Sequence, residues 1–344
     1  MGDVDPAFIQ DPEFRPKLEV INEAEGIPVI NLSDDSKQLV LEIGDACKKW
    51  GFFQVINHGV PLELRHRMEK LSKEFFHQPL EEKRKVKRDD VCPLGYHDSE
   101  HTINVRDWKE LFDFLVDDQT VVPVSSEPDD HEVRTLINQW PESPPGFREA
   151  CKEYAREVEK LGHKVMELIC LSLGLPADRC RGYFTDQTSI YRLNYYPPCP
   201  VPNLGFGVQP HKDASFFTVL TPDYTVEGLE VKRKTDEQWV RVQPIPDAFI
   251  INLGDIFQVL SNDAYESIMH RVVLNPVKER LSMLLFFFPS HYVSVKPFDE
   301  LVNELNPAKY KAHNWGKFFA ARNLSNFKKL PRENLVIQHY KVSQ

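Results

Sequence analysis

The sequence predicts a mostly β protein with helices, in which a core of short strands follows a helical N-terminal region. From Ser189 onward the chain carries seven short β-type runs, each bounded by Gly, Pro, Asn or Asp. Strands at this spacing favour a sandwich or barrel, and a double-stranded β-helix (jelly roll) is one such solution. The first half shows helical periodicity instead. At 344 residues the chain can bury a large core without disulfides.

The first elements alternate between β-type runs and a helix. The runs cover residues 27–30 and 52–56. Between them, Asp34 or Asp35 can cap a helix that ends near Gly51.

Two further helices follow. One carries apolar residues at intervals of four, three and four positions, namely Leu64, Met68, Leu71 and Phe75. The longest helical pattern starts near Pro145, and Gly174 with Pro176 ends it. The polar, Pro-containing stretch 119–132 between these helices is expected to be a surface loop.

The seven runs of the second half define the predicted β core. They are residues 189–195, 216–221, 228–232, 239–243, 248–253, 270–274 and 281–288. We therefore expect three parts: a helical and short-strand region over 1–186, a jelly-roll core over 187–295 and a helical tail over 296–344.

Charge and composition exclude several classes of partner. The net charge is −10, from 42 Lys and Arg against 52 Asp and Glu. An acidic surface repels phosphate backbones and anionic lipids, so neither nucleic acid nor a membrane is expected as a partner. The first ten residues lack the basic and apolar regions of a signal peptide, which predicts a cytoplasmic protein. No long heptad pattern argues for an oligomer, and we expect a monomer.

The cysteines indicate a reducing compartment. All six are scattered, without a C-x-x-C pair, and match neither a disulfide framework nor a zinc ribbon. Cys151 and Cys170 fall within the longest helical pattern and are expected to be small core residues.

A metal site is predicted from His211, Asp213 and His270. Side chains at i and i+2 of a strand share a face, so His211 and Asp213 project together while Lys212 points away. His270 opens a later β run and can supply a third ligand. Two imidazoles and one carboxylate are the ligand set of non-haem Fe(II) oxygenases. An H-x-D pair alone is a weak signal, and the remaining strands decide its meaning.

A carboxylate-binding set is predicted on two other strands. Arg280 and Ser282 lie at i and i+2 before an apolar run, so both face inward. An inward Arg is costly unless it binds an anion, and guanidinium with hydroxyl suits a carboxylate. Asn194 and Tyr196 form another same-face pair that can complete this site.

Several segments together resemble one family. They are 27–30 (IPVI), 50–59 (WGFFQVINHG), 107–114 around Trp108, 194–200 (NYYPPCP) and 280–282 (RLS). With the His-x-Asp…His pattern, they make the chain similar to the plant-type 2-oxoglutarate/Fe(II)-dependent dioxygenases, which include flavonoid, gibberellin and alkaloid oxygenases. The resemblance runs from about Ile27 to the tail.

The resemblance implies a distorted jelly roll backed by helices. It implies Fe(II) on the predicted triad, 2-oxoglutarate and O2 as co-substrates, and ascorbate as a supporting reductant. Arg280, Ser282 and Tyr196 would bind the distal carboxylate of 2-oxoglutarate, with Asn194 nearby. The implied reaction releases succinate and CO2 and oxidises, by default hydroxylates, a small and largely apolar plant metabolite such as a hormone, flavonoid, terpenoid or alkaloid.

Two alternatives remain open from the sequence. The first is an Fe(II) oxidase of the same fold that does not use 2-oxoglutarate. The second is a non-catalytic jelly-roll binding protein, which would have no reason to keep three metal ligands and an inward Arg and Ser together.

Departures from the family pattern concern the substrate more than the metal. Lys212 stands where relatives have Thr or Ser; it is either a solvated lysine, the favoured interpretation, or a contact to an anionic substrate group. Asp263 and Glu266 alter a turn before His270. The run 220–224 departs from the usual loop at the substrate mouth.

Four residues are candidates for the substrate pocket. Phe286 shares the strand face of Arg280, and Arg192 shares that of Asn194. Leu111 and Phe114 follow Trp108 in a segment that lines the cavity in relatives. Each of the four also fits an ordinary core position.

Overall fold

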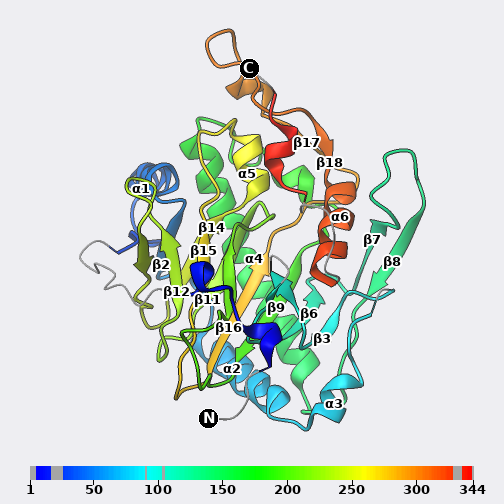
Figure 1. Ribbon diagram of the computed structural model, residues 1–344. Helices are drawn as coiled ribbons and strands as arrows, with labels where there is room; N and C mark the ends of the chain where they lie inside the picture. The colour runs from blue at the N-terminus through cyan, green and yellow to red at the C-terminus, as the bar shows by residue number, and fades with distance from the viewer. Residues whose placement is uncertain (1–4, 17–25, 90, 103–104, 328–334, 343–344) are drawn as a thin grey trace.

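The computed structural model describes residues 5–16, 26–89, 91–102, 105–327 and 335–342 (Figure 1). Part of the predicted C-terminal tail, residues 328–334 and 343–344, therefore lies outside the described residues. Among the described helices, none combines the length and the apolar character needed to cross a membrane.

A large sheet forms the centre of the molecule. Its strand order is β1-β2-β14-β11-β16-β9-β6-β3, in which β1 and β2 are parallel and the other neighbours antiparallel. The bounds are β1 Val29–Asn31, β2 Phe52–Ile56, β3 Gly95–His97, β6 Glu110–Leu115, β9 Ile190–Tyr196, β11 Phe217–Thr221, β14 Phe249–Leu253 and β16 Arg280–Phe286. The sheet thus unites strands from before residue 187 with strands of the predicted core.

A smaller antiparallel sheet completes the jelly roll. Its order is β10-β15-β12-β13, with bounds β10 Val208–His211, β12 Leu229–Lys232, β13 Trp239–Arg241 and β15 His270–Val272. Three two-stranded ribbons are β4 His101–Thr102 with β5 Val105–Arg106, β7 Gln119–Pro123 with β8 Val133–Ile137, and β17 Ser294–Val295 with β18 His313–Asn314. The jelly-roll prediction is confirmed.

The α-helices of the described residues are α1 Ser36–Lys49, α2 Leu62–Phe76, α3 Leu80–Arg84, α4 Phe147–Ser172, α5 Asp255–Leu260 and α6 Trp315–Phe327. Helices α1 and α2 pack on α4 against one face of the large sheet, whereas α6 contacts β4, β7 and β18. Short 3-10 helices occur at Pro6–Phe8, Pro12–Phe14, Arg181–Phe184, Asp299–Leu301 and Ile337–Tyr340. The predicted cap of α1 is Asp35, whose carboxylate accepts a hydrogen bond of 2.9 Å from the Lys37 amide.

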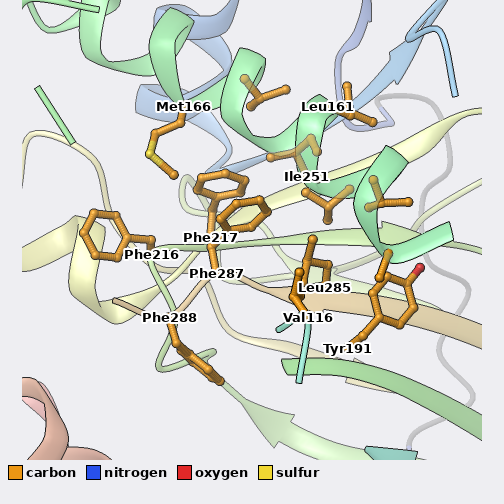
Figure 2. Close-up of a cluster of buried hydrophobic side chains, with 14 of the residues drawn as sticks. Val116, Leu161, Met166, Tyr191, Phe216, Phe217, Ile251, Leu285, Phe287 and Phe288 are labelled. Atoms are coloured by element: carbon orange, nitrogen blue, oxygen red, sulfur yellow. The ribbon is translucent and has the colours of Figure 1, made fainter. Parts of the chain in front are cut away.

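Strand alternation gives the large sheet two different faces. The odd-numbered residues of β9, such as Tyr191, and those of β16, such as Leu285, face α4 and form the main hydrophobic core (Figure 2). In this core the rings of Phe217 and Phe287 stack at 4.6 Å between centroids. The even-numbered residues of the same strands face the smaller sheet, and they carry the polar groups of the site.

One expectation about the chain between the helices is wrong. Residues 119–132 begin not as a loop but as β7, which pairs with β8 in a hairpin that projects at one edge of the molecule (Figure 1). Thr120 and Val122 are buried while Gln119 is exposed, which is the alternation of a half-buried strand. Pro123 is the last residue of β7, a position where a strand tolerates Pro, so its presence in the sequence does not indicate a loop.

The close contact between Gly162 of α4 and Phe287 predicts how a methyl group added at Gly162 would affect stability. A Cβ at Gly162 would lie 2.1 Å from Cζ of Phe287. We therefore expect Gly162→Ala to lower the free energy of unfolding by about 1–3 kcal/mol, as overpacking does, despite the better helix propensity of Ala. Denaturant unfolding measures this change. Gly182→Ala is the control, because nothing lies within 4 Å of its Cβ; equal stability of the two variants would contradict the prediction.

Candidate active site

Three potential metal ligands converge between the two sheets. His211 is the last residue of β10 and lies opposite His270, the first residue of β15. Asp213 follows in the turn toward β11 rather than in the strand itself, which corrects the expected strand placement while keeping both side chains on one side. Asp213 Oδ1 lies 3.5 Å from His211 Nε2 and 3.6 Å from His270 Nε2. One ligand atom from each residue lies within 4.8 Å of the others.

Backbone carbonyls orient both imidazoles. His211 Nδ1 lies 2.8 Å from the Gln209 carbonyl oxygen, and His270 Nδ1 lies 3.1 Å from that of Ile268. A carbonyl oxygen only accepts, so each Nδ1 carries the proton and each Nε2 keeps its lone pair. Both lone pairs are thereby available to a metal ion, in the arrangement usual for metal-bound histidines.

Two uncharged side chains orient the carboxylate. Asp213 Oδ2 accepts hydrogen bonds from Thr218 Oγ1 at 2.6 Å and from Asn252 Nδ2 at 2.8 Å. This leaves Oδ1 for the cluster. Sequence reasoning missed both residues, although each is a polar residue within a largely apolar strand, β11 or β14, on the face toward the smaller sheet.

The electrostatics favour an ionised Asp213 carboxylate beside a neutral His270 imidazole. Burial alone would raise the pKa of Asp213, but His270, His211 and the Thr218 hydroxyl hold this pKa below its ordinary value. Burial, assisted by His211, lowers the pKa of His270 to about 4. These are the protonation states that a divalent cation requires of its ligands.

The predicted carboxylate-binding residues face one another across β9 and β16. Arg280 pairs with Tyr196, and Ser282 pairs with Asn194, so all four side chains share one face. A guanidinium nitrogen of Arg280 lies 3.4 Å from Ser282 Oγ, and its guanidinium carbon lies 5.1 Å from the Tyr196 ring centroid.

Two glycines on the side of the smaller sheet lie against Arg280 and Tyr196. A Cβ at Gly207 would lie 2.8 Å from the Tyr196 ring, and one at Gly228 would lie 3.3 Å from Nε of Arg280. Arg280 and Tyr196 therefore point into the space between the two sheets. Thr218 and Asn252, which bind Asp213, lie on the same face of the same sheet.

Arg280 is buried without a counterion from the described residues. Its side chain is 4% exposed, and no described carboxylate lies within ion-pair distance. Its Nε and the Asn194 Oδ1 are buried without a hydrogen-bond partner among the described residues. Because a buried unpaired charge is costly, this set fits an anionic ligand such as the carboxylate of 2-oxoglutarate.

Comparisons with known proteins agree with this geometry. A family model for the N-terminal region of the non-haem dioxygenases in morphine synthesis matches residues 27–143, and one for the 2OG-Fe(II) oxygenase superfamily matches residues 187–289. DMR6-LIKE OXYGENASE 1 of Arabidopsis thaliana is 38% identical over 330 residues, covering 91% of this chain and 88% of that protein. The chain belongs to the plant 2-oxoglutarate/Fe(II)-dependent dioxygenases. It is an oxidoreductase that uses Fe(II) and 2-oxoglutarate.

Two other known proteins are also similar to this dioxygenase. Flavanone 3-dioxygenase 2 of Oryza sativa subsp. japonica is 34% identical over 324 residues, covering 92% of this chain and 90% of that protein. The crystal structure of JOX2 in complex with 2OG, Fe and JA has a TM-score of 0.83 and 30% identity, and covers 100% of this chain and 95% of that one.

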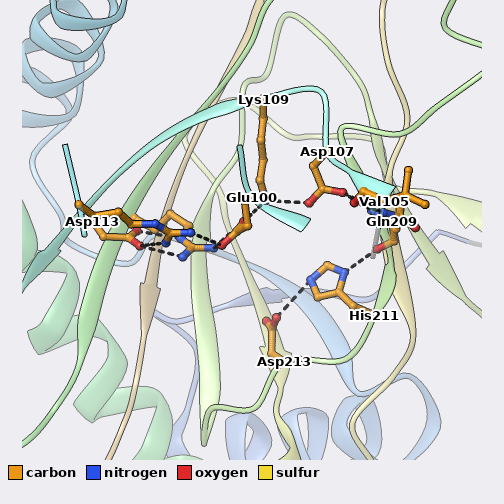
Figure 3. A network of polar contacts seen from close by, with 10 residues as sticks. Glu100, Val105, Asp107, Lys109, Asp113, Gln209, His211 and Asp213 are labelled. Atoms are coloured by element: carbon orange, nitrogen blue, oxygen red, sulfur yellow. Dashed lines mark hydrogen bonds and ion pairs between the residues drawn. The ribbon is translucent and has the colours of Figure 1, made fainter. Parts of the chain in front are cut away.

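A buried network of charges lies beside the candidate metal site of the dioxygenase (Figure 3). Arg192 makes a two-pronged contact with Asp113, at 2.8 and 2.7 Å, and lies 3.1 Å from Glu100. Lys109 binds Glu100 at 2.6 Å. Arg88 lies within 4 Å of both acids. Burial opposes the charge on Glu100, but Arg192, Lys109 and Arg88 hold its pKa well below the ordinary value.

This network reaches the candidate metal ligand His211 through Gln209. Lys109 lies 3.3 Å from Asp107, whose Oδ1 accepts from both the backbone and the side-chain nitrogen of Gln209 at 3.4 Å. The Gln209 side chain also donates to the Val105 carbonyl at 2.8 Å. Since the Gln209 carbonyl receives the Nδ1 proton of His211, a chain of contacts runs from the charged network to the His211 ring (Figure 3).

The four candidates for the substrate pocket do not all lie on the same face of the large sheet. Leu111, Arg192 and Phe286 lie on the face toward the smaller sheet, with the Arg192 guanidinium 5.7 Å from the Phe286 ring. Phe114 lies on the opposite face of β6, stacked on Tyr191 in the core against α4. The interpretation of Phe114 as a pocket residue is therefore abandoned, because sequence proximity to Trp108 does not decide on which face a strand residue lies.

Lys212 is neither fully solvated nor part of this face. It is half-buried, and its charge acts on Asp255. Burial raises the pKa of that carboxyl to about 6, while Arg322 and Lys212 oppose the increase.

The link from Asp107 to His211 predicts an effect on iron affinity. Asp107→Asn removes the charge that holds both Gln209 nitrogens and Lys109, so we expect the dissociation constant for Fe(II) to rise by about tenfold. Anaerobic titration with Fe(II) measures this constant, and thermal unfolding measures stability separately. Asp118→Asn is the control, because Asp118 is an exposed partner of Lys152. A lower Tm with unchanged iron affinity would show that Asp107 only supports the fold.

Proposed function

We propose that this dioxygenase hydroxylates a small, largely apolar plant metabolite or hormone. In this proposal His211, Asp213 and His270 hold Fe(II), and Arg280, Ser282 and Tyr196 bind the distal carboxylate of 2-oxoglutarate with Asn194 beside them. The observation that carries it is the buried Arg280, which lacks a counterion among the described residues and shares a sheet face with the side chains that orient Asp213.

The residues of the chain have separate tasks. Thr218 and Asn252 fix the Asp213 carboxylate, and the carbonyls of Gln209 and Ile268 hold the Nδ1 protons of the two histidines. Arg280 neutralises the distal carboxylate. When bound, Fe(II) and 2-oxoglutarate supply the activation of O2 for oxidation of a C–H bond, with release of succinate and CO2.

Two features support a largely apolar and uncharged substrate. Leu111 and Phe286 present apolar groups to the space between the sheets. Arg192 already engages Asp113 and Glu100, so a substrate carboxylate would have to compete with two buried acids for its guanidinium. The names of the relatives fit small molecules as substrates: one is a flavanone dioxygenase, and JOX2 was crystallised with JA.

The cofactor roles are tested by anaerobic titration with Fe(II) and 2-oxoglutarate, with the weak visible charge-transfer band of the chelated keto acid as the readout. We expect His211→Ala to abolish the band. Arg280→Ala is expected to weaken 2-oxoglutarate binding by about 100-fold, because loss of one partner of a buried charge pair costs about 2–5 kcal/mol. Arg148→Ala, at an exposed ion pair with Asp118, is the control.

Other outcomes discriminate between the alternatives. Iron binding without the band in the unmodified protein would favour an oxidase that does not use 2-oxoglutarate. No iron binding would favour the non-catalytic binding protein and contradict the proposal. Once the band is established, succinate release in the presence of candidate metabolites tests the substrate class, and turnover restricted to acidic substrates would contradict the apolar assignment.

A further inference from the structure

Two cysteine thiols meet in the core, away from the iron centre. Cys170 lies in the last turn of α4, and Cys180 immediately precedes the 3-10 helix Arg181–Phe184. Their sulfur atoms are 3.4 Å apart, and both residues are fully buried with free thiols. Cys170 is a small core residue, as the sequence predicts, and its ten-residue separation from Cys180 across a helix end matches no cysteine motif.

The turn between the two cysteines brings them together. Gly174 adopts a positive φ of 76° and ends α4, and the Leu175 amide donates to the Cys170 carbonyl at 3.0 Å. The chain then returns along the helix end to Cys180. A disulfide has an S–S distance near 2.05 Å, so the sulfurs need to approach by only about 1.4 Å.

The two thiols are not equivalent. The hydrogen bond with Cys180 lowers the pKa of Cys170 despite burial, and the nearby Arg179 guanidinium acts in the same direction. Arg179 is itself held by Glu300, at 2.7 and 3.2 Å. The pKa of Cys180 is raised by the same hydrogen bond and by burial. Cys170, whose thiol has the lower pKa, is therefore the better nucleophile.

A surface pocket is lined by residues that flank the two cysteines in sequence. Its volume is about 270 Å³, and it is lined from α4 by His163, Met166 and Glu167 and from the returning chain by Ala177, Asp178 and Arg181. Met166 and Glu167 lie about one helical turn before Cys170, and Arg181 is next to Cys180. The Glu167–Arg181 ion pair, 3.4 Å long, joins the two walls through exposed side chains. Such exposed pairs are weak, so this one adds little to the stability of the contact between the two walls.

We propose that Cys170 and Cys180 form a reversible oxidation site that a peroxide converts to a disulfide. The Cys170 thiolate attacks one peroxide oxygen, the O–O bond breaks, and the other oxygen leaves as water or an alcohol with the thiol proton. The Cys180 sulfur then attacks the resulting sulfenic sulfur, the S–O bond breaks, and water leaves with the Cys180 proton. The thiols lose two electrons in total, and the peroxide gains them.

The test uses the full chain with a chelator present, so that iron does not react with the peroxide. Protein is treated with hydrogen peroxide, alkylated, digested without reductant and analysed by mass spectrometry. We expect a linked peptide pair that contains Cys170 and Cys180, is lighter than the reduced pair by two hydrogen atoms, and disappears with dithiothreitol. Full alkylation of both cysteines after peroxide would overturn the proposal, as would oxidation confined to the half-buried Cys92.

Single variants test the order of the steps. In Cys180→Ser, a sulfenic acid at Cys170 should accumulate and be trapped by dimedone, whereas in Cys170→Ser no sulfenic acid should form at Cys180. Cys151→Ser is the matched control, because Cys151 is also buried in α4 and should leave the cross-link unchanged. A cross-link that forms only after unfolding in urea would show that the native contact does not direct it.

Discussion

The register between β9 and β16 is the constraint on which the active site depends. Their pairing sets Arg280 opposite Tyr196 and Ser282 opposite Asn194, while the alternate residues pack against α4. A shift by one residue would turn the Arg280 guanidinium into the aromatic core and an apolar side chain toward the candidate metal ligands. The dense packing of Phe217 and Phe287 against α4 therefore also keeps the polar face in place.

A second feature of the structure is its set of buried charged side chains. Arg192, Lys109 and Arg88 share the carboxylates of Glu100, Asp113 and Asp107, and this compensation allows six charged groups to leave water. Arg280 differs, because no described carboxylate reaches it. Arg192 and Arg280 are both inward-facing arginines on β strands, but only Arg192 has carboxylate partners among the described residues. This difference supports the proposal that Arg280 binds an anionic ligand.

Much of the fold and the centre of the site could be predicted from local patterns. Strand alternation placed Arg280, Ser282, Asn194 and Tyr196 on one face, and helical periodicity located α1, α2 and α4. The remaining features depend on contacts between distant segments. Asn252 orients Asp213 from 39 positions away in the chain, and Asp107 reaches Gln209 across 102 positions. Residues 119–123 and Phe114 were misjudged because their neighbours across the sheet decide their environment.

The contact between Asp107 and Gln209 has a consequence for the modularity of the enzyme. Asp107 lies in the segment matched by the N-terminal family model, and Gln209 in the segment matched by the superfamily model. A chimera could take its N-terminal half from one relative and its C-terminal half from another. The residues on the two sides of this contact would then come from different proteins. In such a chimera, the hydrogen bonds between Asp107 and Gln209, more than the apolar core, would decide whether the two halves are compatible.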